Sequence, residues 1–333
     1  MKDIIESGEK KQETQPRNYA LFIVQWGLMK VFSGSSNKPL AEKIAKNLGL
    51  KLSPCEIFIF PDGERRIRIL EKVVDEEVVI VQTTSPLPDK NYMELFFLVD
   101  AAKRSGAKSI TVVVPYLGYQ RQDHVFREGE AVSLEVIAET LEATGINKLI
   151  VFDLHSIKIP ENFSIPVVHL SALPIFAERI KKLFKDYKDS VLISPDMGGI
   201  RRIKILSELL DNTPYVAIEK NRDLATGDIE SSNFDTKDSG FAKIAKRAII
   251  VDDMISTGGT IVAAVDLLVK NGIKENFVFA THPVFSNESK EILQNSKLAK
   301  IFVTDTIKIP ENKKFEKLEV LSVAGEIAEN LKS

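Results

Sequence analysis

Short apolar runs alternate with longer amphipathic segments from residue 29 to the end of the chain. Some of these runs, such as Ala248–Val251, are apolar at every position, which is typical of strands buried on both faces of a parallel sheet. We therefore predict a series of strands, several of them buried. They are Lys30–Phe32, Glu56–Phe60, Val78–Gln82, Ile110–Tyr116, Leu149–Leu154, Val167–His169, Val191–Ser194, Tyr215–Glu219, Ala248–Val251, Phe277–Ala280 and Ile301–Thr304.

The segments between the apolar runs have the spacing of amphipathic helices. Ser133–Thr144 carries Val136 and Ile137 in an apolar stripe, and Ser133 is a candidate N-cap. Strands that alternate with helices in this way predict an α/β fold. The predicted helices are Lys38–Leu48, Met93–Arg104, Ser133–Thr144, Ile200–Leu210, Ile261–Lys270 and Val323–Leu331.

The predicted strands are too many for one comfortable open sheet of this type. We therefore expect two similar domains, each a mainly parallel sheet flanked by helices, with the boundary near Leu170–Leu173. This places an N-terminal domain at residues 29–171 and a C-terminal domain at residues 172–333. The polar segment 1–28 is expected to be a disordered extension.

Charge and composition narrow the class of protein. Lys and Arg number 45 and Asp and Glu number 47, and this balance argues against a nucleic-acid binder. The single cysteine, Cys55, cannot form an intramolecular disulfide, which fits a reducing compartment. No apolar run reaches the roughly 18 residues that a membrane span needs, and the first residues do not have the pattern of a signal peptide. A cytoplasmic protein without a membrane partner is expected.

The most informative motif follows the predicted strand Ala248–Val251. It reads Asp-Asp-Met-Ile-Ser-Thr-Gly-Gly-Thr, from Asp252 to Thr260, and a predicted helix comes directly after it. The carboxylates of Asp252 and Asp253 are suited to the two vicinal hydroxyls of a ribose, because each carboxylate accepts two hydrogen bonds well. In isolation, two adjacent aspartates would more simply be solvated side chains at a strand end.

The second half of this motif has the features of a phosphate cradle. Backbone N–H groups at the start of a helix bind anions, and nearby hydroxyl groups add donors. Glycines let the backbone approach a phosphate closely. The motif therefore predicts a ribose 5-phosphate site whose phosphate is held by Ser256, Thr257, Gly258, Gly259 and Thr260.

Three other short strings follow predicted strands. Phe60-Pro61-Asp62-Gly63-Glu64 is a turn sequence, Arg121 and Gln122 could contact an anion and a base edge, and Lys220 and Arg222 place two cations close together. Each string alone is equally compatible with an ordinary loop.

In this order along one chain, the strings resemble the ribose-phosphate pyrophosphokinase family, whose members make phosphoribosyl diphosphate. Further matches are Asp153-Leu154-His155, the Ser-Pro-Asp-Met-Gly-Gly string at 194–199, and Ala280-Thr281-His282-Pro283. The resemblance extends from about residue 29 to the C-terminus. It implies two similar domains of the type I phosphoribosyltransferase fold, of which the C-terminal one carries the ribose-phosphate loop.

The resemblance also implies how ATP is held. One set of residues matches the loop that contacts adenine, which in this family comes from a neighbouring subunit, so we expect a homo-oligomer. Another set matches residues that bind ATP within the same subunit. The implied ATP-binding residues are Phe60, Asp62, Glu64, Arg121, Gln122 and Asp123.

The family pattern further assigns the metal and the transferring group. His155 and Asp196 match positions implicated in divalent metal binding, with Mg²⁺ as the implied cofactor and Asp153 as a neighbouring candidate oxygen ligand. Lys220 and Arg222 match a mobile loop thought to stabilise the diphosphate as it is transferred. The implied reaction converts ATP and ribose 5-phosphate into AMP and 5-phospho-α-D-ribose 1-diphosphate.

Two departures and two alternatives remain open. The familiar family members have Lys-Arg-Arg-Pro where this chain has Lys220-Asn221-Arg222-Asp223, and Asp where it has Ser256. These departures leave quaternary structure and allosteric control open. One alternative function is a phosphoribosyltransferase that consumes the diphosphate, and the other is a catalytically silent relative that regulates an active partner.

Overall fold

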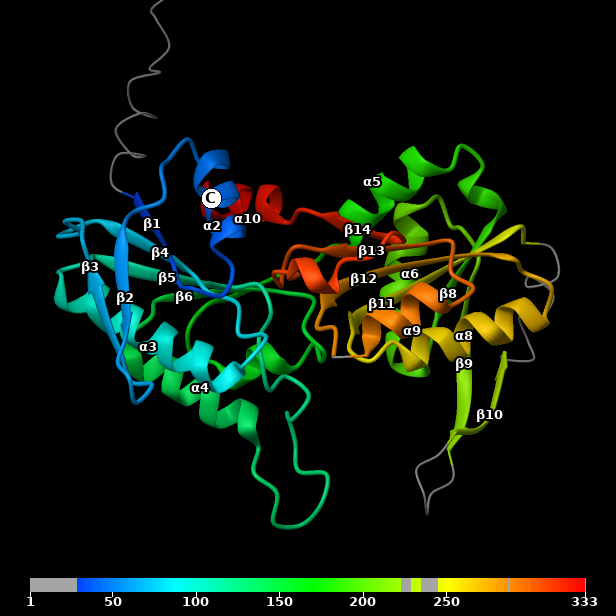
Figure 1. Ribbon diagram of the computed structural model, residues 1–333, viewed down its shortest axis with the longest axis horizontal. Coiled ribbons are helices and arrows are strands. Elements are labelled where there is room, and N and C mark those ends of the chain that lie inside the picture. The colour runs from blue at the N-terminus through cyan, green and yellow to red at the C-terminus, as the bar shows by residue number, and fades with distance from the viewer. Residues whose placement is uncertain (1–28, 223–228, 235–244, 287, 333) are drawn as a thin grey trace, which may run out of the picture.

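The computed structural model describes residues 29–222, 229–234, 245–286 and 288–332 (Figure 1). For residues 219–222 and 229–234 it describes the backbone only. The predicted disordered extension, residues 1–28, lies outside the described residues. Figure 1 shows two sheets side by side along the long axis of the molecule, each flanked by helices.

The first sheet is parallel throughout, in the order β1-β4-β5-β6-β7. Its central strands are buried along almost their whole length, as expected for continuous apolar runs covered by helices on both faces. The strands are β1 (Met29–Ser33), β4 (Glu77–Val81), β5 (Ser109–Val114), β6 (Lys148–Phe152) and β7 (Val167–Leu170). The helices of this half are α2 (Lys38–Asn47), α3 (Pro88–Arg104) and α4 (Ser133–Thr144).

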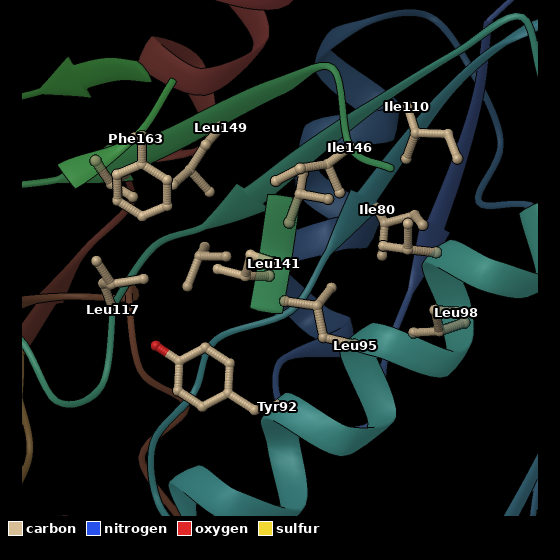
Figure 2. Close-up of a cluster of buried hydrophobic side chains, with 14 of the residues drawn as sticks. Ile80, Tyr92, Leu95, Leu98, Ile110, Leu117, Leu141, Ile146, Leu149 and Phe163 are labelled. Carbon is tan, nitrogen blue, oxygen red and sulfur yellow. The ribbon is translucent and has the colours of Figure 1, made fainter. Parts of the chain in front are cut away.

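One face of the first sheet packs against α3 and α4 (Figure 2). Leu95 and Leu98 of α3 face the sheet residues Ile80 and Ile110, and Tyr92 points toward Leu117; each of these side chains is at most 2% exposed. Burying a side chain of this size stabilises the fold by about 1.5–3 kcal/mol. This packing holds the strand ends of the first sheet in fixed positions.

An antiparallel hairpin, β2 (Cys55–Ile59) and β3 (Arg65–Ile69), lies beside the first sheet. Figure 1 shows it at the end of the molecule opposite the second sheet. β3 was not among the predicted strands. Its residues alternate between arginine and isoleucine after Arg65, so it has the period of a half-buried strand without a continuous apolar run.

The second sheet has the order β10-β9-β8-β11-β12-β13-β14, and every described pair except β9–β10 is parallel. The prediction of two mainly parallel, helix-flanked sheets is confirmed. The strands are β8 (Ser190–Ser194), β9 (Tyr215–Arg222), β10 (Ile229–Phe234), β11 (Arg247–Ile255), β12 (Glu275–Pro283), β13 (Lys300–Thr304) and β14 (Leu318–Leu321). The helices are α5 (Leu173–Leu183), α6 (Ile200–Leu209), α8 (Gly259–Lys270) and α9 (Ser289–Asn295).

The last helix, α10 (Ala324–Lys332), returns from the second sheet to the first half of the chain. Figure 1 shows it beside α2, and its residue Ile327 shares a buried cluster with Leu40 and Ile44 of that helix. The two halves are therefore joined at both ends of the second half.

Two local predictions have different outcomes. Helix α4 has the predicted bounds, but the prediction that Ser133 caps it is wrong. Val132 occupies the cap position, no side chain caps the helix, and Ser133 is its first residue. No helix in the described ranges has the length and apolar content needed to cross a membrane.

Candidate active site

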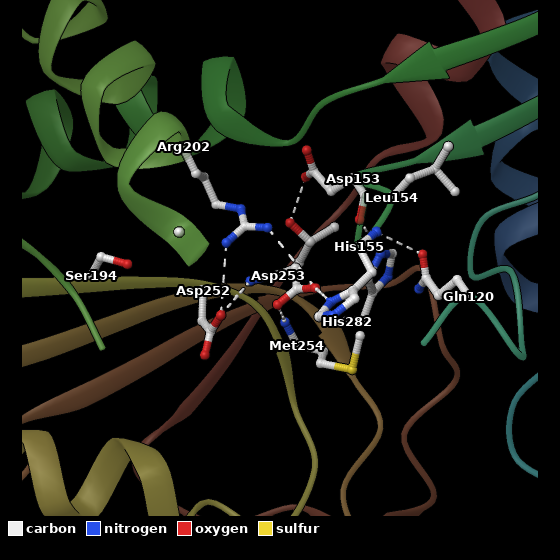
Figure 3. Close-up of polar contacts among 12 residues, drawn as sticks. Gln120, Asp153, Leu154, His155, Ser194, Arg202, Asp252, Asp253, Met254 and His282 are labelled. Atoms are coloured by element: carbon white, nitrogen blue, oxygen red, sulfur yellow. Dashed lines mark hydrogen bonds and ion pairs between the residues drawn. The ribbon is translucent and has the colours of Figure 1, made fainter. Parts of the chain in front are cut away.

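The acidic pair of the principal motif lies within a strand. β11 continues through Asp252 and Asp253 to Ile255, pairing with β12 as far as Ile255. The pair therefore lies at the carboxyl end of a central parallel strand, where ligands of open α/β sheets bind. Figure 3 shows both carboxylates facing residues from α6 and from the end of β6.

Two side chains from other elements meet the acidic pair. His155, which follows β6 of the first sheet, places Nδ1 2.9 Å from Asp253 Oδ2. Arg202 of α6 places Nη1 3.7 Å from Asp252 Oδ1 and Nη2 3.9 Å from Asp253 Oδ2, and its side chain is 16% exposed. The site is thus built across the two halves of the chain.

These contacts separate the pKa values of the two carboxyl groups. Burial and the neighbouring charge of Asp253 raise the pKa of Asp252 well above its usual range, and the charge of Asp196 adds to this. Burial alone would raise the pKa of Asp253, but the hydrogen bond with His155 and the charge of Arg202 outweigh it and hold that pKa well below its usual range. The same hydrogen bond raises the pKa of His155.

The predicted phosphate cradle is an exposed turn into α8. Gly258 has φ of +88°, a conformation that side chains disfavour, and a Cβ at this position would lie 2.9 Å from Leu293 Cδ2. Thr257 and Thr260 are exposed, and Gly259 is the first residue of α8. The start of α8 is therefore exposed at Thr257, Gly259 and Thr260, a few residues beyond the acidic pair.

The string at 194–199 forms a second loop at this edge of the sheet. Asp196 is exposed, and its Oδ1 accepts a hydrogen bond from the Gly199 N–H at 3.3 Å. A Cβ at Gly199 would collide with Ser194 Oγ, so the tight turn requires glycine. Asp196 lies close enough to Asp252 to affect its pKa, as noted above.

Arg121, Asp123 and His155 line a cavity of about 670 Å³ on the first half of the chain. Arg121 and Gln122 line a further cavity of about 620 Å³ that also includes residues of the second half. Arg121 and His155 therefore line the same cavity. Gln120, which is buried, accepts a hydrogen bond from the His155 backbone N–H through Oε1 at 2.9 Å.

The other predicted residues are not assembled here within one chain. Phe60, Asp62 and Glu64 lie at the turn of the β2–β3 hairpin, at the end of the molecule opposite the second sheet. Lys220 and Arg222 lie on β9, where they pair with residues of β10, and their side chains lie outside the described part of the chain.

Sequence reasoning missed Arg202 and Gln120. Arg202 lies in the first turn of α6, directly after the Gly198-Gly199 turn, so a cation just after a glycine turn at a strand end was the available signal. Gln120 precedes Arg121 directly and gave no signal of its own. Asp153, which the sequence offered as a neighbouring oxygen ligand, accepts three hydrogen bonds through its carboxylate.

Comparisons with known proteins agree with this geometry. Residues 29–145 match the N-terminal domain of ribose phosphate pyrophosphokinase, and residues 169–316 match the phosphoribosyl transferase domain. A ribose-phosphate pyrophosphokinase of Fusobacterium nucleatum is 40% identical over 301 residues, covering 90% of this chain and 93% of the relative. The Bacillus subtilis protein of the same name is 39% identical, covering 90% of this chain and 92% of the relative.

A solved structure gives the same result for the fold. The phosphoribosylpyrophosphate synthetase of Mycobacterium smegmatis superposes with a TM-score of 0.83 and 32% identity, covering 91% of this chain and 97% of that one. The chain therefore belongs to the ribose-phosphate pyrophosphokinase family, with two phosphoribosyltransferase-type domains.

Proposed function

We propose that this chain transfers the β,γ-diphosphate of ATP to the C1 hydroxyl of ribose 5-phosphate. The C1 oxygen attacks the β-phosphorus, the bond from that phosphorus to the α,β-bridging oxygen breaks, AMP leaves, and the hydroxyl proton is released. One observation carries the proposal: the strand–helix turn that holds the acidic pair and the cradle meets the other half of the chain through the Asp253–His155 contact. Such transfers depend mainly on positioning and charge neutralisation.

The ribose 5-phosphate site is proposed on the second sheet. Asp252 and Asp253 would accept hydrogen bonds from the ribose hydroxyls, and the exposed N–H groups at the start of α8 would hold the 5-phosphate. The cradle residues are Ser256, Thr257, Gly258, Gly259 and Thr260. Arg202 would keep the acidic pair from repelling an incoming phosphorylated sugar, because it lies against both carboxylates.

The ATP site is proposed on the first half of the chain. Arg121 and Asp123 line the cavity that His155 closes on one side, and its volume of about 670 Å³ can hold a nucleotide triphosphate. Arg121 would pair with phosphate oxygens, and Gln122 would contact the base. The phosphate chain of ATP would then lie between Arg121 and the proposed ribose 5-phosphate site.

Mg²⁺ fits the donor groups at the junction of these two sites. Charge from Asp253 and Asp196 raises the pKa of Asp252, so a divalent cation would relieve their mutual repulsion. In the described ranges no three His, Cys, Asp or Glu side chains could hold a metal by themselves. Mg²⁺ commonly uses few protein ligands together with substrate phosphates, so His155 and Asp196 would hold it with ATP. When bound, the ion neutralises charge on the phosphate oxygens.

We propose that Lys220 and Arg222 stabilise the transferring diphosphate, mainly in the transition state. Lys220→Ala should then lower kcat by about 10²–10³-fold with a smaller change in KM, as for loss of a transition-state donor. Lys246→Ala is the matched control, since that exposed lysine, directly before β11 of the same sheet, pairs with Asp189. Unchanged kcat in Lys220→Ala would exclude this role.

The active unit is proposed to be a homo-oligomer acting in the cytoplasm. Phe58 and Ile59, beside the Phe60–Glu64 turn, are 42% and 51% exposed, which supports burial of the hairpin against another subunit. Phe60, Asp62 and Glu64 would then contact adenine bound to the neighbour. A fully active monomer in light scattering would contradict this arrangement.

The direct test is AMP release by the purified protein with ATP and Mg²⁺, measured with and without ribose 5-phosphate. AMP formation that requires the sugar phosphate is the expected result. No AMP under varied metal and phosphate conditions would favour the silent regulatory relative. A phosphoribosyltransferase would instead consume added phosphoribosyl diphosphate when given a nucleobase.

A further inference from the structure

A buried polar seam joins the two halves of the chain beneath the candidate site. Its centre is Asp153, the residue after β6, which is 7% exposed. Its Oδ1 accepts a hydrogen bond from Ser171 Oγ at 2.7 Å, and its Oδ2 accepts bonds from the Ala172 N–H at 2.9 Å and from Thr281 Oγ1 at 2.6 Å. These three donors tie the carboxylate to residues on both sides of the seam.

The three donors come from the segment that connects the two halves of the chain and from the second sheet. Ser171 and Ala172 form the segment between β7 and α5, where the chain passes from the first sheet to the second half. Thr281 belongs to β12 in the second sheet, and its side chain is fully buried. One carboxylate at the end of β6 therefore fixes both the connecting segment and a central strand of the opposite sheet.

His282, the next residue on β12, completes the seam. Its Nε2 lies 3.3 Å from the Asp153 carbonyl oxygen, and its Nδ1 lies 3.0 Å from Thr306 Oγ1. A carbonyl only accepts hydrogen bonds, so Nε2 carries the proton in the contact with Asp153. Burial lowers the pKa of His282, which favours the neutral form. The ring of Tyr116 packs edge-on against it at 5.0 Å.

The backbone at Asp153 depends on these contacts. Its φ is +29°, a region that residues with a side chain rarely occupy. Such a conformation persists where surrounding contacts over-determine it, and here the carboxylate and the carbonyl oxygen both have partners across the seam. Contacts with the second half thus help to set the direction in which the chain leaves β6, together with the hydrogen bond from the His155 backbone N–H to Gln120 in the first half.

The chain direction after Asp153 decides where His155 lies. His155 is two residues further on, and its contact with Asp253 is the direct link between the two halves of the site (Figure 3). Asp253 lies on β11, which pairs with β12 in a register that places Asp252 opposite Ala280, next to Thr281. Both sides of the His155–Asp253 contact are thus anchored by neighbouring residues of the seam.

We propose that Asp153, Thr281 and His282 are positioning residues, which hold the nucleotide side of the site in register with the ribose side and touch neither substrate. The inference rests on the proposed function, because register between two bound substrates matters only if a group passes between them. Each half of the site keeps its own binding residues without the seam. Its loss should therefore affect the transfer step more than the binding of either substrate.

Thr281→Val and Thr281→Ser form a matched pair for the test. Valine keeps the shape and loses the donor to Asp153, whereas serine keeps the hydroxyl. We expect Thr281→Val to lower the kcat of sugar-dependent AMP release by about tenfold to a hundredfold, because small misplacements of reacting groups have effects of that size. The Kd of ribose 5-phosphate, measured alone by calorimetry, should stay within about twofold. Thr281→Ser should retain most of the wild-type kcat.

The outcomes separate this inference from the proposed function. If the wild type is active and Thr281→Val has an unchanged kcat, the inference is overturned and the proposed function stands. The same holds if Thr281→Val loses kcat and ribose 5-phosphate affinity equally. A wild type that releases no AMP removes both. If Thr281→Val does not fold, Ser171→Ala removes a different donor to the same carboxylate. It should then show the same split between kcat and Kd, and an unchanged kcat in that variant overturns the inference.

Discussion

The two halves of this protein have similar sheets and very different strand ends. The second sheet offers a glycine turn and carboxylates, Asp252, Asp253 and Asp196, at its carboxyl edge. The first half offers Arg121 and His155 on the loops that follow its strands. Similar scaffolds therefore carry opposite chemistry, and function lies in the loops. The proposed function has the sugar bound to one half and the nucleotide to the other.

The largest expected effect lies on the sugar side. Asp253→Asn should lower kcat/KM for ribose 5-phosphate by about a hundredfold or more, because each hydrogen bond to a charged group contributes about 1.5–3 kcal/mol. ATP binding, measured by calorimetry, should change little. Asp266→Asn is the control, because that half-exposed aspartate of α8 pairs only with Lys297 among the described contacts. Equal losses of affinity for ATP and for ribose 5-phosphate would contradict the assignment of one substrate to each half.

A smaller effect is expected on the nucleotide side. Arg121→Ala should raise the KM for ATP by about tenfold to a hundredfold through loss of a charge-assisted contact. The affinity for ribose 5-phosphate should remain, since the cradle belongs to the other sheet. Arg104→Ala is the control, because that arginine is highly exposed and pairs with Asp100 on the same helix. Initial rates at varied ATP concentration would measure the KM for ATP, and calorimetry would measure the affinity for ribose 5-phosphate.

The smallest effect concerns the scaffold of the first half. Lys30 and Glu71 form an ion pair of 2.7 Å, and its hydrogen bond lowers the pKa of Glu71 and raises that of Lys30. Glu71→Gln should lower the free energy of unfolding at neutral pH by less than about 1 kcal/mol, because the pair is partly exposed.

The pH dependence of this difference has a definite sign. Glu71 has a lowered pKa, so its contribution to stability is present above its unfolded pKa and is lost as pH falls through the folded pKa. Urea unfolding of wild type and Glu71→Gln at neutral and acidic pH would measure it. A difference that grows toward acidic pH would contradict this account, and unchanged activity in the variant would separate scaffold from site.

Much of the fold could be predicted because its strands are buried on both faces. Runs such as Val78–Val81 and Ala248–Val251 are apolar throughout, and their pattern indicates a parallel sheet directly. The strands that were missed, β3, β10 and β14, do not have such runs. β3 carries arginines on one face, and β14 is partly exposed, so neither has a fully apolar sequence.

The site divides in the same way. The acidic pair and the cradle are contiguous in sequence, so their chemistry could be predicted from one motif. Arg202 and Gln120 take part only because the fold brings them to the acidic pair and to His155. The contacts of Asp153 could not be predicted from a local motif, because its carboxylate accepts hydrogen bonds from residues 18 or more positions away.

The central claim is that a diphosphate passes intact from the nucleotide half to the sugar half. Phosphorus NMR of a reaction containing ATP, ribose 5-phosphate, Mg²⁺ and the protein tests it directly. The account predicts that AMP and a new sugar with a diphosphate on C1 form in equal amounts. Formation of ADP with a singly phosphorylated C1, or of AMP with free diphosphate, would contradict it.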